Sequence, residues 1–143
     1  MCEWVELEGV LEYDPDRGTM KSNRPYWLVL QLPFDIVKYY QYFIRTEKHI
    51  DVKDPQWGAH ISIVRGEVPD KPEYWKRYAG KKVKIRFKPI VECIDDKKKD
   101  GNYFVIEFDE PFFNQIREEL GLPHKYLRFH LTVGRTYYDV PCW

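Results

Sequence analysis

HISIVR at residues 60–65 and HLTVGR at residues 130–135 follow one pattern: histidine, an aliphatic residue, serine or threonine, an aliphatic residue, any residue, arginine. The two stretches begin 70 residues apart (130 minus 60). Each is rich in β-branched and apolar residues, which predicts a β-strand in both places. A repeat of this length within one short chain indicates an internal duplication.

The segments around the two motifs repeat the order strand, strand, helix, strand. Runs of alternating or continuous apolar residues predict the strands, and apolar residues at helical spacing predict the helices. We expect strands at 4–13, 26–32, 57–65, 81–93, 103–108 and 128–135 and helices at 33–49 and 110–121. Gly121 is placed to end the second helix. Because no linker separates the repeats, residues 1–143 are predicted to form a single α+β domain of two half-repeats, roughly 1–70 and 71–143.

Charge and aromatic content restrict the class of ligand. Lys plus Arg and Asp plus Glu number 23 each, so the formal net charge is 0 and no global field draws the chain to nucleic acid or to an anionic membrane. Aromatic residues make up 17% of the chain, with 11 Tyr and 5 Trp, a content that suits stacking on bases. Because the chain has no global positive field, any phosphate must be bound by local groups.

The cysteines and the N-terminus indicate the compartment. Cys2, Cys93 and Cys142 are odd in number, far apart and without metal-ligand spacing, which argues against a disulfide framework or a structural zinc. The first residues lack the basic and apolar regions of a signal peptide, and no run of about 18 apolar residues occurs. We therefore expect a cytoplasmic protein with reduced thiols and no membrane partner.

The two motif strands each present an imidazole and a hydroxyl. Successive side chains of a strand point to opposite faces, so His60 and Ser62 share one face, about 7 Å apart, while the aliphatic residues point into the core. His130 and Thr132 are arranged in the same way. If the halves are related by a twofold axis, two imidazoles and two hydroxyls meet in one cleft.

Such a set of groups suits phosphoryl transfer. One imidazole removes a proton from the attacking oxygen and the other protonates the leaving oxygen, while the hydroxyls stabilise charge on the non-bridging oxygens. A metal or other cofactor is not expected, because two histidines without carboxylates on the same strand faces leave a divalent ion short of ligands. A single strand histidine is usually structural, but two equivalent copies favour catalysis.

GAHISIVRGE and FHLTVGR resemble the paired H-x-[ST]-x motifs of the two-histidine (2H) phosphoesterase superfamily. EGVLEYDP, DIVKYYQYFI and IREELGLP are similar to its branch of Swiss-army-knife RNA-repair-like proteins, which is related to the phage anti-CBASS nucleases that destroy cyclic oligonucleotide signals. The resemblance covers nearly the whole chain. Ser62 stands where many members have threonine, which keeps the hydroxyl.

The resemblance implies a bilobal 2H phosphoesterase fold, with two pseudo-symmetric antiparallel-sheet lobes and outer helices around a central cleft. It also implies metal-independent cleavage of nucleotide phosphodiesters by His60 and His130 as acid and base, in an order that stays open at this point. The expected substrate is a small nucleotide or cyclic oligonucleotide. RNA-end 2′,3′-cyclic phosphate processing or RNA repair is the alternative, and a non-catalytic nucleotide- or RNA-binding module is the rival from another class.

Further residues are candidates for substrate binding. Arg65 and Arg135 lie five residues past their histidines, on the opposite face of an unbroken strand, so a β-bulge or the strand's end is needed to bring them to the phosphate. Candidates for stacking on a base are the aromatic residues Tyr13, Tyr26, Trp27, Trp57, Tyr74, Trp75, Tyr137, Tyr138 and Trp143. The loop and tail residues Tyr74, Trp75, Tyr138 and Trp143 are favoured among them. A basic row on one strand is expected to be a solvated face that discourages edge pairing, with guidance of a polyanion as the alternative. Its members are Lys82, Lys84, Arg86 and Lys88.

Overall fold

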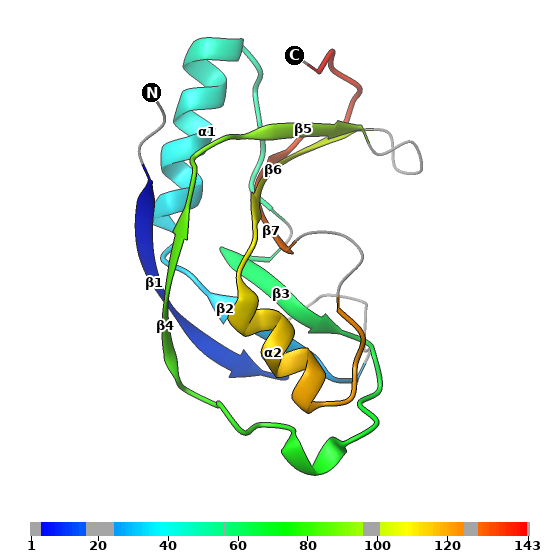
Figure 1. Ribbon diagram of the computed structural model, residues 1–143. Helices are drawn as coiled ribbons and strands as arrows, with labels where there is room; N and C mark the ends of the chain where they lie inside the picture. The colour runs from blue at the N-terminus through cyan, green and yellow to red at the C-terminus, as the bar shows by residue number, and fades with distance from the viewer. Residues whose placement is uncertain (1–3, 17–24, 56, 96–100, 125–128, 143) are drawn as a thin grey trace.

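The strands of the described residues form one antiparallel sheet in the order β4-β1-β2-β3-β7-β6-β5 (Figure 1). The computed structural model describes residues 4–16, 25–55, 57–95, 101–124 and 129–142. Its elements, in chain order, are β1 (Val5–Tyr13), β2 (Trp27–Gln31), α1 (Asp35–Lys48), β3 (His60–Arg65), a 3-10 turn (Pro72–Tyr74), β4 (Lys82–Phe87), β5 (Glu92–Asp95), β6 (Asn102–Phe108), α2 (Pro111–Glu119) and β7 (Phe129–Arg135). The predicted α+β class is confirmed.

One predicted strand is divided in two. The segment 81–93 forms β4 and β5, which lie at opposite edges of the sheet. Pro89 stands between them, and proline has no N–H to donate to a strand ladder. The chain therefore leaves one edge after β4 and crosses to the other edge as β5 (Figure 1).

β3 and β7 form the centre of the sheet. They pair antiparallel at Ile61 and Leu131, both fully buried. α1 packs against β7 and α2 against β3, so each helix contacts the motif strand of the other half. Burial of these apolar surfaces is the main favourable term in folding. No helix in the described ranges is long and apolar enough to cross a membrane.

The two motif strands carry β-bulges at equivalent positions. Between β2 and β3 the register passes from the pair Val29–Ser62 to the pair Leu28–Val64, which leaves Ile63 without a partner in the ladder. Between β6 and β7 it passes from Val105–Thr132 to Phe104–Gly134, which leaves Val133 without one. Ile63 and Val133 occupy the same place in their motifs. A bulge of one residue exchanges the faces of all side chains beyond it.

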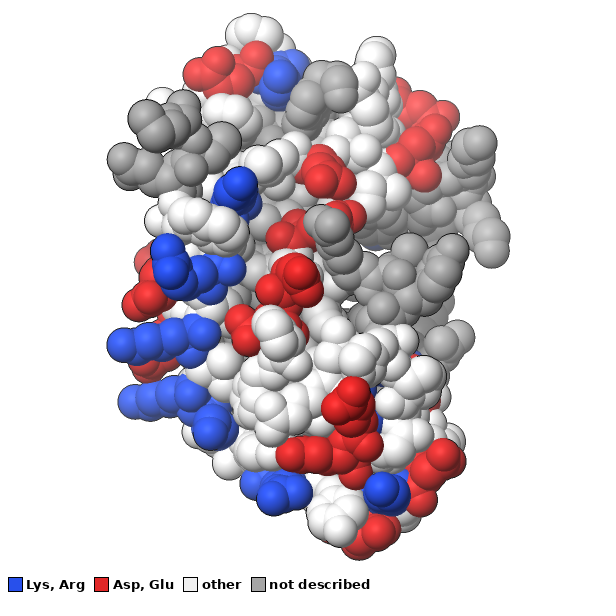
Figure 2. Space-filling model, in the orientation of Figure 1, with Lys and Arg blue, Asp and Glu red and all other residues white. Residues whose placement is uncertain are grey.

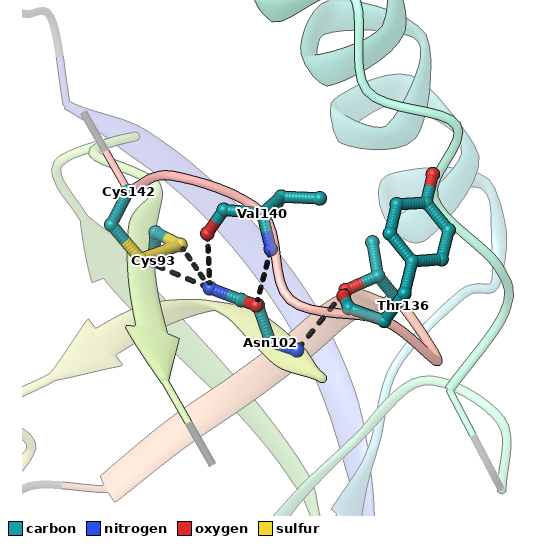
Figure 3. Close-up of a disulfide and its surroundings, with 6 residues drawn as sticks. Cys93, Asn102, Thr136, Val140 and Cys142 are labelled. Atoms are coloured by element: carbon teal, nitrogen blue, oxygen red, sulfur yellow. Dashed lines mark hydrogen bonds between the residues drawn. A yellow bond between two sulfur atoms is a disulfide. The ribbon is translucent and has the colours of Figure 1, made fainter. Parts of the chain in front are cut away.

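The C-terminal segment returns to the sheet and is joined to β5 (Figure 3). Cys93 and Cys142 form a disulfide, with Cα atoms 5.5 Å apart, so the expectation of reduced thiols was wrong for these two residues. Buried Asn102 binds the same segment, since Nδ2 donates to the Val140 carbonyl at 3.1 Å and Oδ1 accepts from the Val140 N–H at 3.0 Å. Cys93 and Cys142 are 49 residues apart in the sequence, so no local pattern indicates that they meet. Cys2 lies outside the described residues.

We expect Asn102→Ala to lower the free energy of unfolding by about 2 kcal/mol, because the half-buried N–H and carbonyl of Val140 lose their partner in the core. Urea unfolding of the non-reduced protein measures this change. Gln115→Ala is the control, because that exposed amide makes one contact of 3.4 Å with Glu119 and its loss should change stability by less than about 0.5 kcal/mol. Equal effects of the two substitutions would contradict the anchoring role.

Candidate active site

The pairing of β3 with β7 places the two motifs side by side. Around the pair Ile61–Leu131, antiparallel counting sets His60 opposite Thr132 and Ser62 opposite His130. These neighbours share the sheet face that lies away from the buried aliphatic residues, with Cβ atoms about 5 Å apart across the strands. Each imidazole therefore lies next to the hydroxyl of the other motif as well as near its own. The structure brings all of these predicted site residues together.

His60 is held in one tautomer. Its Nδ1 lies 2.9 Å from the carbonyl oxygen of Trp57, and because a carbonyl can only accept, Nδ1 carries the proton and Nε2 carries the lone pair. The indole rings of Trp57 and Trp27 pack against the imidazole at 4.8 and 5.6 Å. The backbone thus orients the ring, and the indoles shield it from water.

The surroundings keep His60 uncharged near neutral pH. Burial lowers the pKa of His60 to about 4, the hydrogen bond to Trp57 offsets part of that shift, and the positive charge of Arg65 adds to it. His130 also acts on His60 through its charge, which agrees with their place on one sheet face. An imidazole that is neutral at pH 7, with Nε2 unprotonated, is in the protonation state that a general base requires.

His130 stands in a different environment. Its side chain is exposed, and its partner in the β6–β7 register is Glu107. The corresponding partner of His60 in β2 is the neutral Gln31. A carboxylate next to an imidazole on the same face stabilises positive charge there. Glu107 is a site neighbour that the sequence did not single out, because nothing local links it to the motif.

Ser62 is held by a buried tryptophan. Trp27 is 2% exposed, and its Nε1 donates to Ser62 Oγ at 3.1 Å. Thr132, the equivalent residue of β7, is half-buried. The sequence offered Trp27 as one of several aromatics. In the structure Trp27 contacts both Ser62 and His60 and so helps to fix their positions.

The bulges turn both arginines toward the histidine face. Beyond the bulge Arg65 pairs with Trp27, and its guanidinium lies 5.8 Å from the centre of an indole ring of that residue. Arg135 pairs with Tyr103 and stacks between Tyr103 and Tyr137, at 5.1 and 4.3 Å. The bulge that the sequence analysis required is therefore present in both strands.

Arg117 of α2, which sequence reasoning missed, fixes the bulge of β3. Its side chain is 1% exposed, and Nη1 donates to the carbonyl of bulge residue Ile63 at 2.9 Å. The same guanidinium binds both carboxylate oxygens of Glu67, at 2.7 and 2.6 Å. Ile63 and Glu67 flank Arg65 in sequence, so the buried guanidinium of Arg117 holds the chain on both sides of Arg65.

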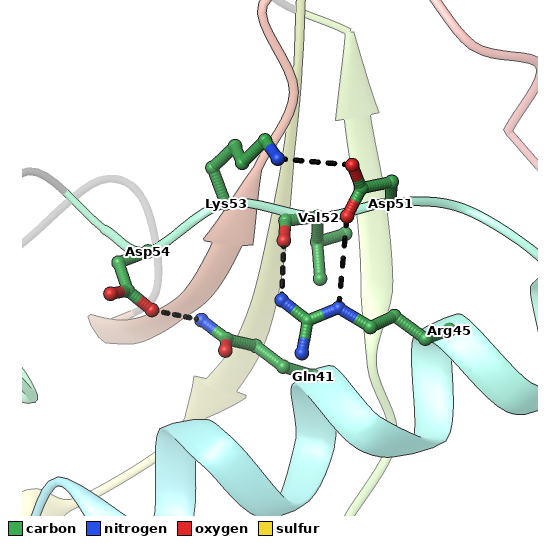
Figure 4. A network of polar contacts seen from close by, with 6 residues as sticks. All are labelled: Gln41, Arg45, Asp51, Val52, Lys53 and Asp54. Carbon is green, nitrogen blue, oxygen red and sulfur yellow. Dashed lines mark hydrogen bonds and ion pairs between the residues drawn. The ribbon is translucent and has the colours of Figure 1, made fainter.

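A second network, around Lys53 (Figure 4), supports Arg135. The N–H and carbonyl of Arg135 exchange hydrogen bonds with Lys53, at 3.0 and 2.8 Å. The segment around Lys53 is tied to α1, because Arg45 donates to the Val52 carbonyl at 2.7 Å and Gln41 donates to Asp54 at 2.9 Å. Each arginine of the site is thus positioned by a helix.

The predicted stacking residues lie in several places. Tyr13 and Trp75 pack edge to face at 4.8 Å, and Trp75 also donates Nε1 to Asp14 at 2.9 Å, so this pair forms an aromatic cluster at the end of β1. Tyr138 is exposed in the C-terminal segment. Trp143 lies outside the described residues. The aromatic ring in contact with His60 from a loop is instead that of Trp57.

The basic row of β4 faces acidic residues. Arg86 and Lys84 are paired in register with Glu6 and Glu8 of β1, and all of these side chains are exposed. Figure 2 shows blue side chains projecting from the β4 edge and red ones over the middle of the same view, without a broad positive face. The row therefore resembles a protected sheet edge more than a track for a polyanion.

Comparison with known proteins gives one match. A family model described as Swiss Army Knife, 2H phosphoesterase domain, matches residues 27–141. That range includes both motifs, both bulges and Arg117. Neither the curated proteins nor the solved structures contain a match to the chain.

Loss of the buried pair should destabilise the protein strongly. We expect Arg117→Ala to lower the free energy of unfolding by roughly 2 to 4 kcal/mol, because the carbonyls of Ile63 and Pro123 lose their donor and the half-buried Glu67 loses its partner. Arg77→Ala is the matched control, since Arg77 lies 3.8 Å from Glu119 with half of its side chain exposed and should contribute less than about 1 kcal/mol. Chemical unfolding of both variants measures the difference, and a small effect of Arg117→Ala would refute the anchoring role.

Proposed function

Because the chain belongs to the 2H phosphoesterases, as a Swiss Army Knife domain, we propose that it hydrolyses cyclic oligonucleotide second messengers by acid–base catalysis between His60 and His130. Its family membership makes the chain a phosphodiesterase; the substrate and the residue roles are our proposal. The observation that carries it is the β3–β7 register, which sets each imidazole beside the hydroxyl of the other motif. The reacting phosphorus then lies between the two histidines.

We assign the base to His60. Nε2 takes the proton from the attacking oxygen, a water or a ribose 2′-hydroxyl, while Nδ1 stays bound to the Trp57 carbonyl. As the new P–O bond forms, the bond to the leaving oxygen breaks, and the electron pair goes to that oxygen. His130, beside Glu107, supplies the proton that neutralises it. The different surroundings of the two rings support this order.

The non-bridging oxygens gain negative charge as the phosphorus is attacked. Ser62 and Thr132 are assigned to hydrogen-bond these oxygens, and Arg65 and Arg135 to neutralise them. The support is positional, because both bulges turn the arginines to the histidine face. A planar guanidinium suits two phosphate oxygens at once.

The two halves of the chain, roughly 1–70 and 71–143, are proposed to be copies that form pseudo-symmetric lobes around a central cleft. Several observations support this. Both motif strands carry a bulge at the same motif position, and the four residues between the histidine and the arginine have the same burial in β3 as in β7. A nucleotide bound between the lobes would meet one motif from each copy.

A compact nucleotide fits the charge distribution better than long RNA. The formal net charge is 0, and the basic row of β4 is opposed by glutamates. Long RNA rewards a broad positive surface, whereas a small ligand needs a few local cations such as Arg65 and Arg135. Processing of RNA ends with 2′,3′-cyclic phosphates uses the same groups and is the alternative. A non-catalytic binding module would not need two imidazoles in these opposed environments.

We expect the purified protein to hydrolyse cyclic oligonucleotides in the presence of EDTA, faster than it opens 2′,3′-cyclic mononucleotides or cleaves short RNAs. His60→Ala and His130→Ala should each lower kcat by several orders of magnitude, and the double variant should be little worse, because the two groups act in one step. Chromatography of the products gives both results. Turnover retained in a folded single variant rules out the two-histidine mechanism, and a preference for RNA ends selects the alternative.

The pH profile tests the role of His60. A base must be unprotonated, and the pKa of His60 is lowered to about 4, so kcat/KM should fall on the acid side only as the pH drops through about 4. An ordinary histidine would give an acid limb near 6.5. His130→Ala should remove the alkaline limb and leave the acid limb in its residual activity. An acid limb near 6.5 in the wild-type protein would overturn the assignment of the base.

A further inference from the structure

A groove of about 430 Å³ lies along the second half of β1. The residues that line it and matter here are Val10, Glu12, Gln31, Lys76, Ala79 and Gly80. The first two belong to β1, Gln31 belongs to β2, and the rest follow the 3-10 turn. The proposed function does not use any of these side chains.

The groove begins one strand away from His60. Gln31 pairs with His60 across β2 and β3, and Val10 pairs with Gln31 across β1 and β2. Paired residues point to the same face, so these side chains form a row that leads away from the histidine. At about 4.8 Å per strand the row spans roughly 10 Å, a length that matches the reach from a phosphate to the edge of its base.

The polar groups of the groove are mainly acceptors, with one cation. Gln31 Nε2 donates to Glu12 Oε2 at 2.7 Å, which fixes the carboxylate in place and leaves it further acceptor sites. Lys76 is exposed and lies at the same groove. Val10, 39% exposed, and Ala79 add apolar surface. The groove therefore suits a flat ligand that carries adjacent hydrogen-bond donors and one hydrogen-bond acceptor.

We propose that this groove binds a guanine base of the substrate. Guanine presents N1–H and an exocyclic amine side by side, which suit the carboxylate of Glu12, and next to them O6, which suits the ammonium of Lys76. Adenine would set the lone pair of its N1 against the carboxylate. A site built to accept hydrogen bonds rejects an analogue that cannot donate them. This inference rests on the proposed function, because it takes the phosphate to lie between the histidines.

The test measures binding apart from turnover. His130→Ala, whose substitution lies away from the groove, is titrated by calorimetry with guanosine 2′,3′-cyclic phosphate and with its adenosine counterpart. We expect the guanosine compound to bind at least tenfold more tightly. Adding Glu12→Gln should abolish that preference by weakening only the guanosine compound, about tenfold, and adding Lys76→Met should weaken it several-fold.

Glu8→Gln is the matched control. Glu8 lies on β1, is exposed, and pairs with Lys84 outside the groove, so its substitution should leave both affinities unchanged. Thermal unfolding checks that Glu12→Gln is folded, and Lys76→Met gives a second readout from an exposed position. Equal binding of the two nucleotides, binding of neither, or a preference that survives Glu12→Gln would overturn the proposal. Failure of the proposed function looks different: guanine preference in binding persists, but the wild-type protein turns over no phosphodiester.

Discussion

The antiparallel pairing of β3 with β7 is the constraint on which the rest of this structure depends. The pair Ile61–Leu131 is buried, so the aliphatic residues of both motifs face the core and the histidines and hydroxyls face the other way. A slip of one residue in the pairing would reverse the faces of one strand and bury its histidine. Burial of the aliphatic residues therefore specifies the register, and the register sets the spacing of the histidines and hydroxyls.

The bulges extend this arrangement to the arginines at a cost that other contacts offset. A bulge leaves the backbone groups of one residue outside the ladder, and at Ile63 the buried guanidinium of Arg117 supplies the missing donor. A buried ion pair contributes little net stability, but losing one partner is expensive. We interpret the Arg117–Glu67 pair as a device for conformational specificity, which keeps Arg65 on the histidine face.

Equivalent motifs need not do equivalent chemistry. Both imidazoles lie on strands with the same motif and the same bulge. Trp57 and Trp27 nevertheless enclose His60, while His130 is exposed opposite Glu107. Phosphoryl transfer requires one group that accepts a proton and one that donates it. In the proposed mechanism the two motifs provide two copies of the side chain, and their neighbours separate the roles. The groove at Glu12 lies on the His60 side of the pair.

The sequence by itself determined which residues could meet. Alternation of side chains along a strand is a local property, so the shared faces of His60 with Ser62 and of His130 with Thr132 followed from spacing alone, as did the need for a bulge at the arginines. Only the tertiary structure decided what depends on distant segments: the break at Pro89, the disulfide between Cys93 and Cys142, the carbonyl of Trp57 beneath His60 and the ion pair at the bulge. The physical reason is that strand periodicity is written in neighbouring residues, whereas burial, pairing partners and electrostatic surroundings arise from chain segments that meet only on folding.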